Sequence, residues 1–168
     1  MKKAEFVGKV FIPLVAVVTV LSFIPFLSTS KKDITISQGQ VEKTISLSIG
    51  QAQVKAFVAN TGPLRQRGLG GRDDISNDEA MLFIFGNSAL HGIWMKDMRF
   101  PIDIFWIDET LRIVFIKESV LPSSYPEVFA PNVPVKYVLE TRAGFARENN
   151  VKIGTSVFLK NLLNHLAF

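Results

Sequence analysis

The amino-acid sequence divides into one long apolar segment and a following part in which short apolar runs alternate with polar residues. Residues 10–27 contain no charged side chain and have about the length, ~17–25 residues, that a helix needs to cross the hydrocarbon layer of a membrane. Three lysines precede this run, and Lys31 and Lys32 follow it, which favours a cytoplasmic N-terminus by a small margin. We therefore expect residues 1–30 to form a membrane anchor, with the rest of the chain extracytoplasmic in a single-pass arrangement.

A cleaved signal peptide is the alternative interpretation of the same segment, and it would leave a secreted protein. Small residues at 28–30 follow the apolar run, as at a cleavage site. A retained anchor is favoured because the run is longer than the roughly 7–15 apolar residues of an ordinary signal peptide. Residues 31–43 are polar and predict a linker, and residues 44–168 predict one globular outer domain.

The outer part has the two-residue period of β-strands. Residues 44–49 place Ile45, Leu47 and Ile49 on one face, and Gly50-Gln51 separates them from a second run over 52–59, which predicts a hairpin. Further strands are expected at residues 81–85, 102–107, 111–116, 137–140 and 156–159.

Helix signals in the outer part are short. Thr61-Gly62-Pro63 predicts a helix start, and the glycines from Gly68 onward end that helix within two turns. Residues 143–149 predict a second short helix, and four prolines make residues 122–136 an extended, non-helical excursion. The expected fold is mainly β (β-rich α+β): a compact barrel-like or sandwich sheet of about seven short strands with one or two short helices, preceded by one transmembrane helix.

Charge and cysteine content narrow the classes of function. The net charge is +4, of which three lysines and one glutamate ahead of the apolar run contribute +2, so the outer part carries about +2. We therefore expect no nucleic-acid partner, because such proteins present a strongly basic surface. The chain has no cysteine, which excludes disulfides, a thiolate nucleophile and a zinc–thiolate site. No recognised metal-ligand or cofactor motif is present, so we expect neither a metal nor a cofactor.

Residues 91–103 form the densest mixture of charged and large apolar side chains. His91, Lys96 and Asp97 could bind a polar ligand against the face of Trp94, or support acid–base transfer. The alternative is structural: Trp94 and Met95 fill the core, Lys96 and Asp97 form a turn, and His91 lies in a surface loop.

Two carboxylates fall inside apolar runs, where an unpaired charge is costly. Asp103 is expected to have a cationic or backbone partner, with Arg65 or Arg72 as the candidate cation, and Glu140 raises the same question. Each is either a structural ion pair or capping group, or a ligand-binding or catalytic carboxylate. The arginines around the glycine-rich loop could cradle an anion, or pair locally with the acids at 73–79.

Several short motifs occur along the outer part in a characteristic order. They are Arg65 with Gly68-Leu69 and Gly71-Arg72, Ala80 to Phe83, Trp94 to Met98, Pro101 to Ile104, and Val138 to Glu140 with Ala143-Gly144 and Gly154. Over residues 45–159 this pattern resembles the domain-of-unknown-function 192 family. The resemblance implies a small, mainly β domain, often exported or membrane-anchored in prokaryotes, without an established activity. The chain departs from the pattern at Gly70, Ala80 and Asp97-Met98, where methionine, glycine and asparagine-threonine are usual.

Three functional hypotheses follow. The first is a non-enzymatic module of the cell envelope, held at the membrane by residues 10–27, that binds a small polar ligand or an envelope protein. Its candidate binding residues are Arg65, Arg72, His91, Trp94, Lys96, Asp97, Asp103 and Glu140. The second is an envelope hydrolase or lyase that uses Asp103 or Glu140 with His91, and the third is a structural assembly factor.

Overall fold

A computed structural model describes residues 43–160 of the chain. The predicted anchor over residues 1–30, nearly all of the predicted linker and the C-terminal residues 161–168 lie outside the described residues. Between residues 43 and 160 there is no helix with the length and apolar composition needed to cross a membrane.

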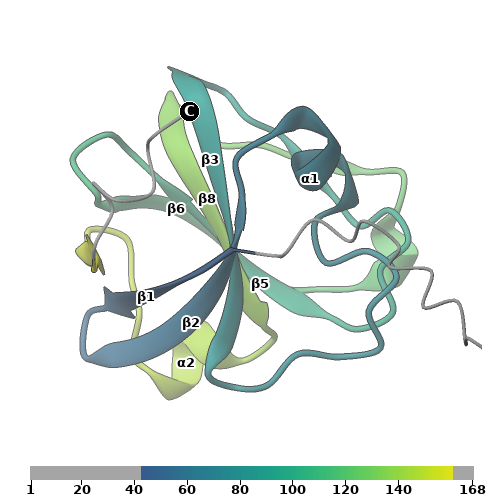
Figure 1. The fold of residues 1–168 in the computed structure, drawn as a ribbon, viewed down its shortest axis with the longest axis horizontal. Helices are drawn as coiled ribbons and strands as arrows, with labels where there is room; N and C mark the ends of the chain where they lie inside the picture. Colours follow the sequence, from purple (N-terminus) through teal and green to yellow (C-terminus); the bar gives the residue numbers. More distant parts are fainter. Residues whose placement is uncertain (1–42, 161–168) are drawn as a thin grey trace, which may run out of the picture. The chain divides into compact units, whose positions relative to one another are not determined.

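The described part is a mainly β domain built on one seven-stranded sheet that curves into a half-barrel (Figure 1). The sheet strands are β1 (Thr44–Ile49), β2 (Ala52–Ala59), β3 (Glu79–Ala89), β5 (Ile102–Ile107), β6 (Ile113–Val120), β8 (Val135–Arg142) and β9 (Val157–Leu159), in the spatial order β6-β5-β8-β3-β2-β1-β9. The sheet is mixed, because β2 and β3 are parallel and the other neighbours are antiparallel. This confirms the mainly β class and the strand number expected from the sequence.

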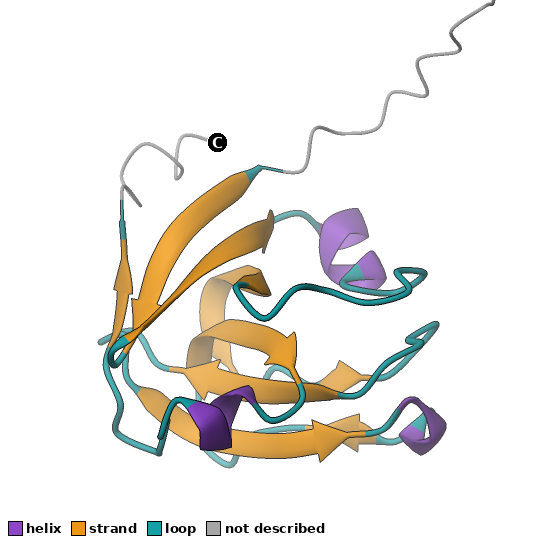
Figure 2. Cartoon of the chain, turned by 90° about the horizontal axis from the view of Figure 1, so that it is seen from below, coloured by secondary structure: helices purple, strands orange, loops and turns teal. Residues whose placement is uncertain are grey.

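In the described part, five short elements lie outside this sheet. The helix α1 (Gly62–Arg67) connects β2 to β3, and α2 (Phe145–Glu148) follows β8. A separate two-stranded ribbon pairs β4 (Ile93–Trp94) with β7 (Val128–Phe129), and a one-turn 3-10 helix, η1, spans Pro122–Ser124. Figures 1 and 2 show α1 and α2 at separate places around the sheet.

Both faces of the sheet are buried, and each has its own apolar core. One core contains Leu47, Val54, Leu82, Phe105 and Leu139, and α2 contributes Phe145 and Ala146 to it. The other contains Met81, Phe83, Ile104, Trp106 and Val138, with Ile93 of β4 and Phe129 of β7. Because successive side chains of a strand point to opposite faces, each central strand contributes alternate residues to the two cores.

The local predictions were accurate where the pattern was regular. The bounds predicted for the strands at 44–49, 52–59 and 102–107 are confirmed, as are the two short helices. The strand predicted at 111–116 instead spans Ile113–Val120, because the carboxylate of Asp108 accepts hydrogen bonds from the amides of Thr110 and Arg112 and extends the turn. The prediction that residues 122–136 contain no helix was partly wrong, since η1 begins at Pro122. The strands β4 and β7 were not predicted, because a strand of two residues is too short to show a period.

Candidate ligand-binding site

Glu140 lies at the bottom of a small pocket on the face of the sheet that carries Met81 and Ile104. It pairs with these two residues across β3 and β5, and its side chain is 4% exposed. Among residues 43–160, its Oε2 is the buried side-chain polar atom that has no hydrogen-bond partner. Burial raises the pKa of Glu140 to about 8, so the carboxyl group is largely neutral at pH 7.

The pocket is open to solvent above this carboxyl group. It is formed by α1 with the loop that follows it, by β3 and by the β4 segment, with Glu140 from β8 at its base. Its volume is about 80 Å³, which is enough for a few water molecules or one small functional group. A buried polar atom without a partner, next to an accessible cavity, is a group that a ligand can satisfy.

Gly68 lies beside the buried carboxyl group of Glu140. The hydroxyl of Thr61 caps the start of α1, and the helix ends at Gly68, which has a positive φ of 50°. A Cβ at this position would lie 3.1 Å from the ring of Phe83 and 4.0 Å from Oε2 of Glu140. Glycine therefore allows the loop to pack closely against Phe83 and Glu140, where a side chain would crowd the ring of Phe83.

Arg65 is held at the rim of the pocket. Its guanidinium donates a hydrogen bond of 3.0 Å to the carbonyl of Ile84 and lies 5.3 Å from the ring centroid of Phe85. The imidazole of His91 stacks on the same ring at 3.5 Å, with the two rings nearly parallel, and its Nε2 lies 2.9 Å from the carbonyl oxygen of Asn87. The ring of Phe85 thus contacts two of the predicted site residues, Arg65 and His91.

Trp94 contributes an exposed aromatic surface to the same pocket. Its side chain is 43% exposed and makes an edge contact with the ring of Tyr125 at 6.2 Å, whereas Met95 is buried at 1%. The structural alternative, in which both residues fill the core, is therefore wrong for Trp94 and correct for Met95. Lys96 and Asp97 do form a turn, in which Asp97 has a φ of 58°, and Lys96 lines the pocket.

Asp103 lies elsewhere and is fully satisfied. Its Oδ1 accepts a hydrogen bond from the amide of Ser119, and its Oδ2 accepts two, from the amides of Gly144 and Ala146. The expected backbone partner is thus found, while the candidate cation Arg65 donates to Ile84 instead. Through these hydrogen bonds Asp103 connects the start of α2 and the end of β6 to β5.

The other two predicted residues also lie outside the pocket. The guanidinium of Arg72 packs over the ring of Phe57 at 4.3 Å. Asp97 borders a shallow depression with Gly70, Gly71 and Arg99, and its carbonyl accepts the amide of Gly71. The structure therefore brings together Arg65, Trp94, Lys96 and Glu140, with His91 beside them, and separates Arg72, Asp97 and Asp103 from this group.

The apolar walls of the pocket were not among the residues predicted from the sequence. Phe83, Phe85 and Met98 line it, but each looks like an ordinary core residue in the sequence. The short motifs did indicate the site, because Gly68-Leu69, Trp94 and Glu140 are far apart along the chain and all line this pocket.

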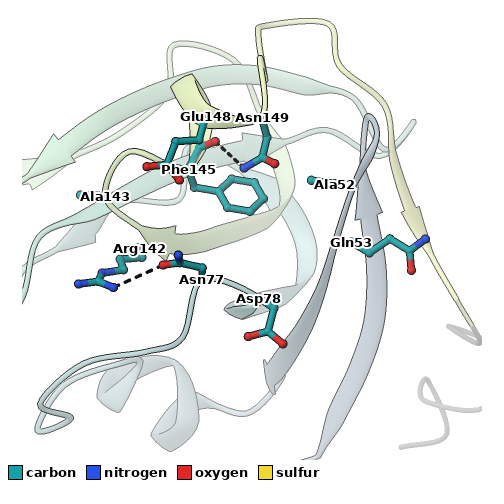
Figure 3. A pocket seen from close by; sticks show the side chains of 9 residues that line it. All are labelled: Ala52, Gln53, Asn77, Asp78, Arg142, Ala143, Phe145, Glu148 and Asn149. Carbon is teal, nitrogen blue, oxygen red and sulfur yellow. Dashed lines mark hydrogen bonds between the residues drawn. The ribbon is translucent and has the colours of Figure 1, made fainter.

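A second, larger pocket of about 270 Å³ lies beside α2 (Figure 3). It is lined by polar groups of Asn77, Asp78, Arg142 and Glu148 around the ring of Phe145. The guanidinium of Arg142 donates a hydrogen bond of 3.4 Å to the side chain of Asn77 and forms an ion pair of 3.3 Å with Asp74. Among the described residues it contains no buried side-chain polar atom without a partner, so the Glu140 pocket is the stronger candidate.

Comparison with known proteins identifies the domain but not its activity. The model of the DUF192 family, described as "Uncharacterized ACR", matches residues 45–159. No curated protein matches the chain. A crystal structure of a candidate transcription regulator from Sinorhizobium meliloti 1021 is similar with a TM-score of 0.67 and 27% identity, covering 70% of this chain and 95% of that one. A protein of unknown function from Novosphingobium aromaticivorans DSM 12444 has the same fold, with a TM-score of 0.65 and 21% identity over 68% of this chain and 84% of its own.

Proposed function

The chain belongs to the DUF192 family, an uncharacterised family, and we propose that its domain is a non-enzymatic module that binds a small ligand in the Glu140 pocket. One observation carries this proposal: Oε2 of Glu140 is buried, has no partner among the described residues, and lies beneath an open pocket. An unsatisfied buried polar group costs about 1–3 kcal/mol, and a ligand that bonds to it recovers that free energy on binding.

The arrangement of the acids supports binding over hydrolysis. Hydrolases of the two-carboxylate type need the two carboxyl groups about 5–10 Å from each other, on either side of the scissile bond in a common cleft. Asp103 is on the opposite face of the sheet from Glu140 and is engaged by three amides. His91 has its ring against Phe85 and its Nε2 at the carbonyl of Asn87, which leaves Glu140 without a partner for acid–base transfer.

We further propose that residues 10–27 hold this module on the outer side of a membrane. The support is the uncharged apolar run and the polar linker over residues 31–43 that follows it. Protease added to intact cells should degrade the domain of the full chain while a cytoplasmic control protein survives. A domain that is protected until the cells are lysed would contradict this topology.

Ligand binding is tested with the full chain, by screening carboxylates, phosphates, sugars, amines and metal ions for a rise in melting temperature. A ligand at about 100 times its dissociation constant should stabilise the domain by about 2.7 kcal/mol. Glu140→Met, which removes the hydrogen-bonding group, should abolish the response, whereas Glu148→Met, the same substitution at the pocket in Figure 3, should leave it unchanged. Equal responses of the two variants would place the ligand outside the Glu140 pocket.

A further inference from the structure

The Glu140 pocket has a chemical character that selects among ligands, and this inference rests on the proposed binding function. We infer that its ligand is a small monocarboxylate, bound through one proton shared between the ligand's carboxylate and the side chain of Glu140. The apolar end of the ligand lies against Trp94. No covalent step is involved, and the ligand leaves unchanged.

The charges around the pocket favour an anion. Arg65 reaches it from α1 and Lys96 reaches it from the turn after β4, and among the described residues that line it Glu140 is the single acid. On the strands that flank Glu140, the paired neighbours Met81 and Ile104 carry no charge. Arg65 and Lys96 therefore outnumber the acid, and their field disfavours a cationic ligand even when Glu140 is ionised.

The protonation state of Glu140 determines which kind of anion the pocket can bind. A neutral carboxyl group has one O–H donor, and a carboxylate oxygen of the ligand is a strong acceptor for it. Because burial raises the pKa of Glu140 to about 8, that proton is present at pH 7. A phosphate dianion needs several donors around three oxygens, whereas the base of this pocket offers one.

The walls fit the rest of a small organic acid. Phe85, Met98 and the exposed face of Trp94 form an apolar side above Glu140. The guanidinium of Arg65 is fixed by Ile84 and Phe85, so it adds charge at the rim at little further cost in side-chain entropy. A volume of about 80 Å³ admits a carboxylate group and leaves the alkyl end to extend along Trp94 toward solvent.

The inference is tested with three probes of the same length: butyrate, butyramide and butylamine. Binding to the full chain is followed by the fluorescence of Trp94 at several pH values between about 6 and 9. Butyrate should bind at least about tenfold more tightly than the other two at pH 6. Its affinity should fall by about tenfold per pH unit above the pKa of Glu140, because one proton must then be taken up on binding.

Glu140→Gln supplies the control for the shared proton. Its amide still donates a hydrogen bond but does not titrate, so butyrate should bind to this variant with an affinity that changes less than about twofold over the same pH range. Retention of the full pH dependence in Glu140→Gln would overturn the inference, because the titrating group would then be another one.

The remaining outcomes separate the inference from the function on which it rests. Equal binding of butyrate and butyramide, or preferred binding of butylamine, would overturn the monocarboxylate assignment and leave the pocket as a binding site. Failure of all three probes also overturns the assignment. The wider ligand screen with the Glu140→Met and Glu148→Met pair then decides separately whether the pocket binds anything.

Discussion

Asp103 and Glu140 lie on neighbouring strands but point to opposite faces of the sheet. Glu140 is paired with Ile104, so the residue before Ile104 must face the other way. Asp103 accordingly faces the core that contains Phe105 and Phe145, where backbone amides donate hydrogen bonds to its oxygens. Glu140 faces the opposite core, and its Oε2 has no partner among residues 43–160. Two buried carboxylates that look equivalent in the sequence therefore have different roles.

Replacing Asp103 by asparagine should destabilise the protein without affecting the Glu140 pocket. The amide offers one acceptor oxygen where the carboxylate accepts three amide hydrogen bonds, and its NH₂ group faces amide donors. We expect the free energy of unfolding to fall by about 2–4 kcal/mol, as measured by urea denaturation of the full chain. A loss below about 1 kcal/mol would show that these bonds do not hold α2 in place.

The pH dependence of stability should reveal Glu140. Burial raises the pKa of Glu140 from the 4.5 of a solvated glutamate to about 8 in the folded domain, so between these values the folded state keeps a proton that the unfolded state has released. The free energy of unfolding should therefore decrease as the pH rises through this window, by up to about 1.4 kcal/mol per pH unit from this group. The difference between the parent and Glu140→Gln in urea denaturation isolates this contribution, and parallel curves would show that the carboxyl group is not buried.

The two tryptophans should report separately on the pocket and on the core. Trp94 is 43% exposed, whereas Trp106 is fully buried and its indole donates a hydrogen bond of 2.8 Å to the carbonyl of His91. Trp94→Phe should remove most of the acrylamide-quenchable fluorescence and cost less than about 1 kcal/mol. Trp106→Phe should cost about 2–3 kcal/mol and leave the quenching in place. Quenching that persists in Trp94→Phe would contradict the exposed position of this side chain.

Gly68→Ala and Gly71→Ala should separate backbone strain from obstruction of the pocket. Both glycines have a positive φ, but a Cβ at Gly68 meets Phe83 and lies near Glu140, whereas a Cβ at Gly71 meets nothing within 4 Å. Gly71→Ala should cost about 1–2 kcal/mol from conformational strain alone. Gly68→Ala should cost more in a thermal denaturation experiment, and it should also weaken ligand binding, which Gly71→Ala should preserve. Similar binding by both variants would exclude Gly68 from the site.

Local pattern determined much of the fold in advance. Residues 44–49, 52–59 and 102–107 form strands with the predicted bounds, because the two-residue period is a local property. The first helix begins at Gly62, within the predicted Thr61-Gly62-Pro63 start, and ends before Gly68, because capping and glycine also act locally. The order of the strands was not predictable in this way. The neighbours of β8 are β3 and β5, which are distant from it in the sequence, and the parallel pairing of β2 with β3 depends on the crossover through α1.

The candidate site shows the same division. From residue type alone, Arg65, Trp94, Lys96 and Glu140 were candidate binding residues. Arg72, Asp97 and Asp103 were candidates on the same grounds. Only the tertiary structure separated the two groups, because strand register decides which face a carboxylate enters and loop packing decides which cations reach it. The pattern of residues was sufficient to predict acids inside apolar strands of a β domain. The fold determined that one of them is satisfied by three amides and that Oε2 of the other has no hydrogen-bond partner among the described residues.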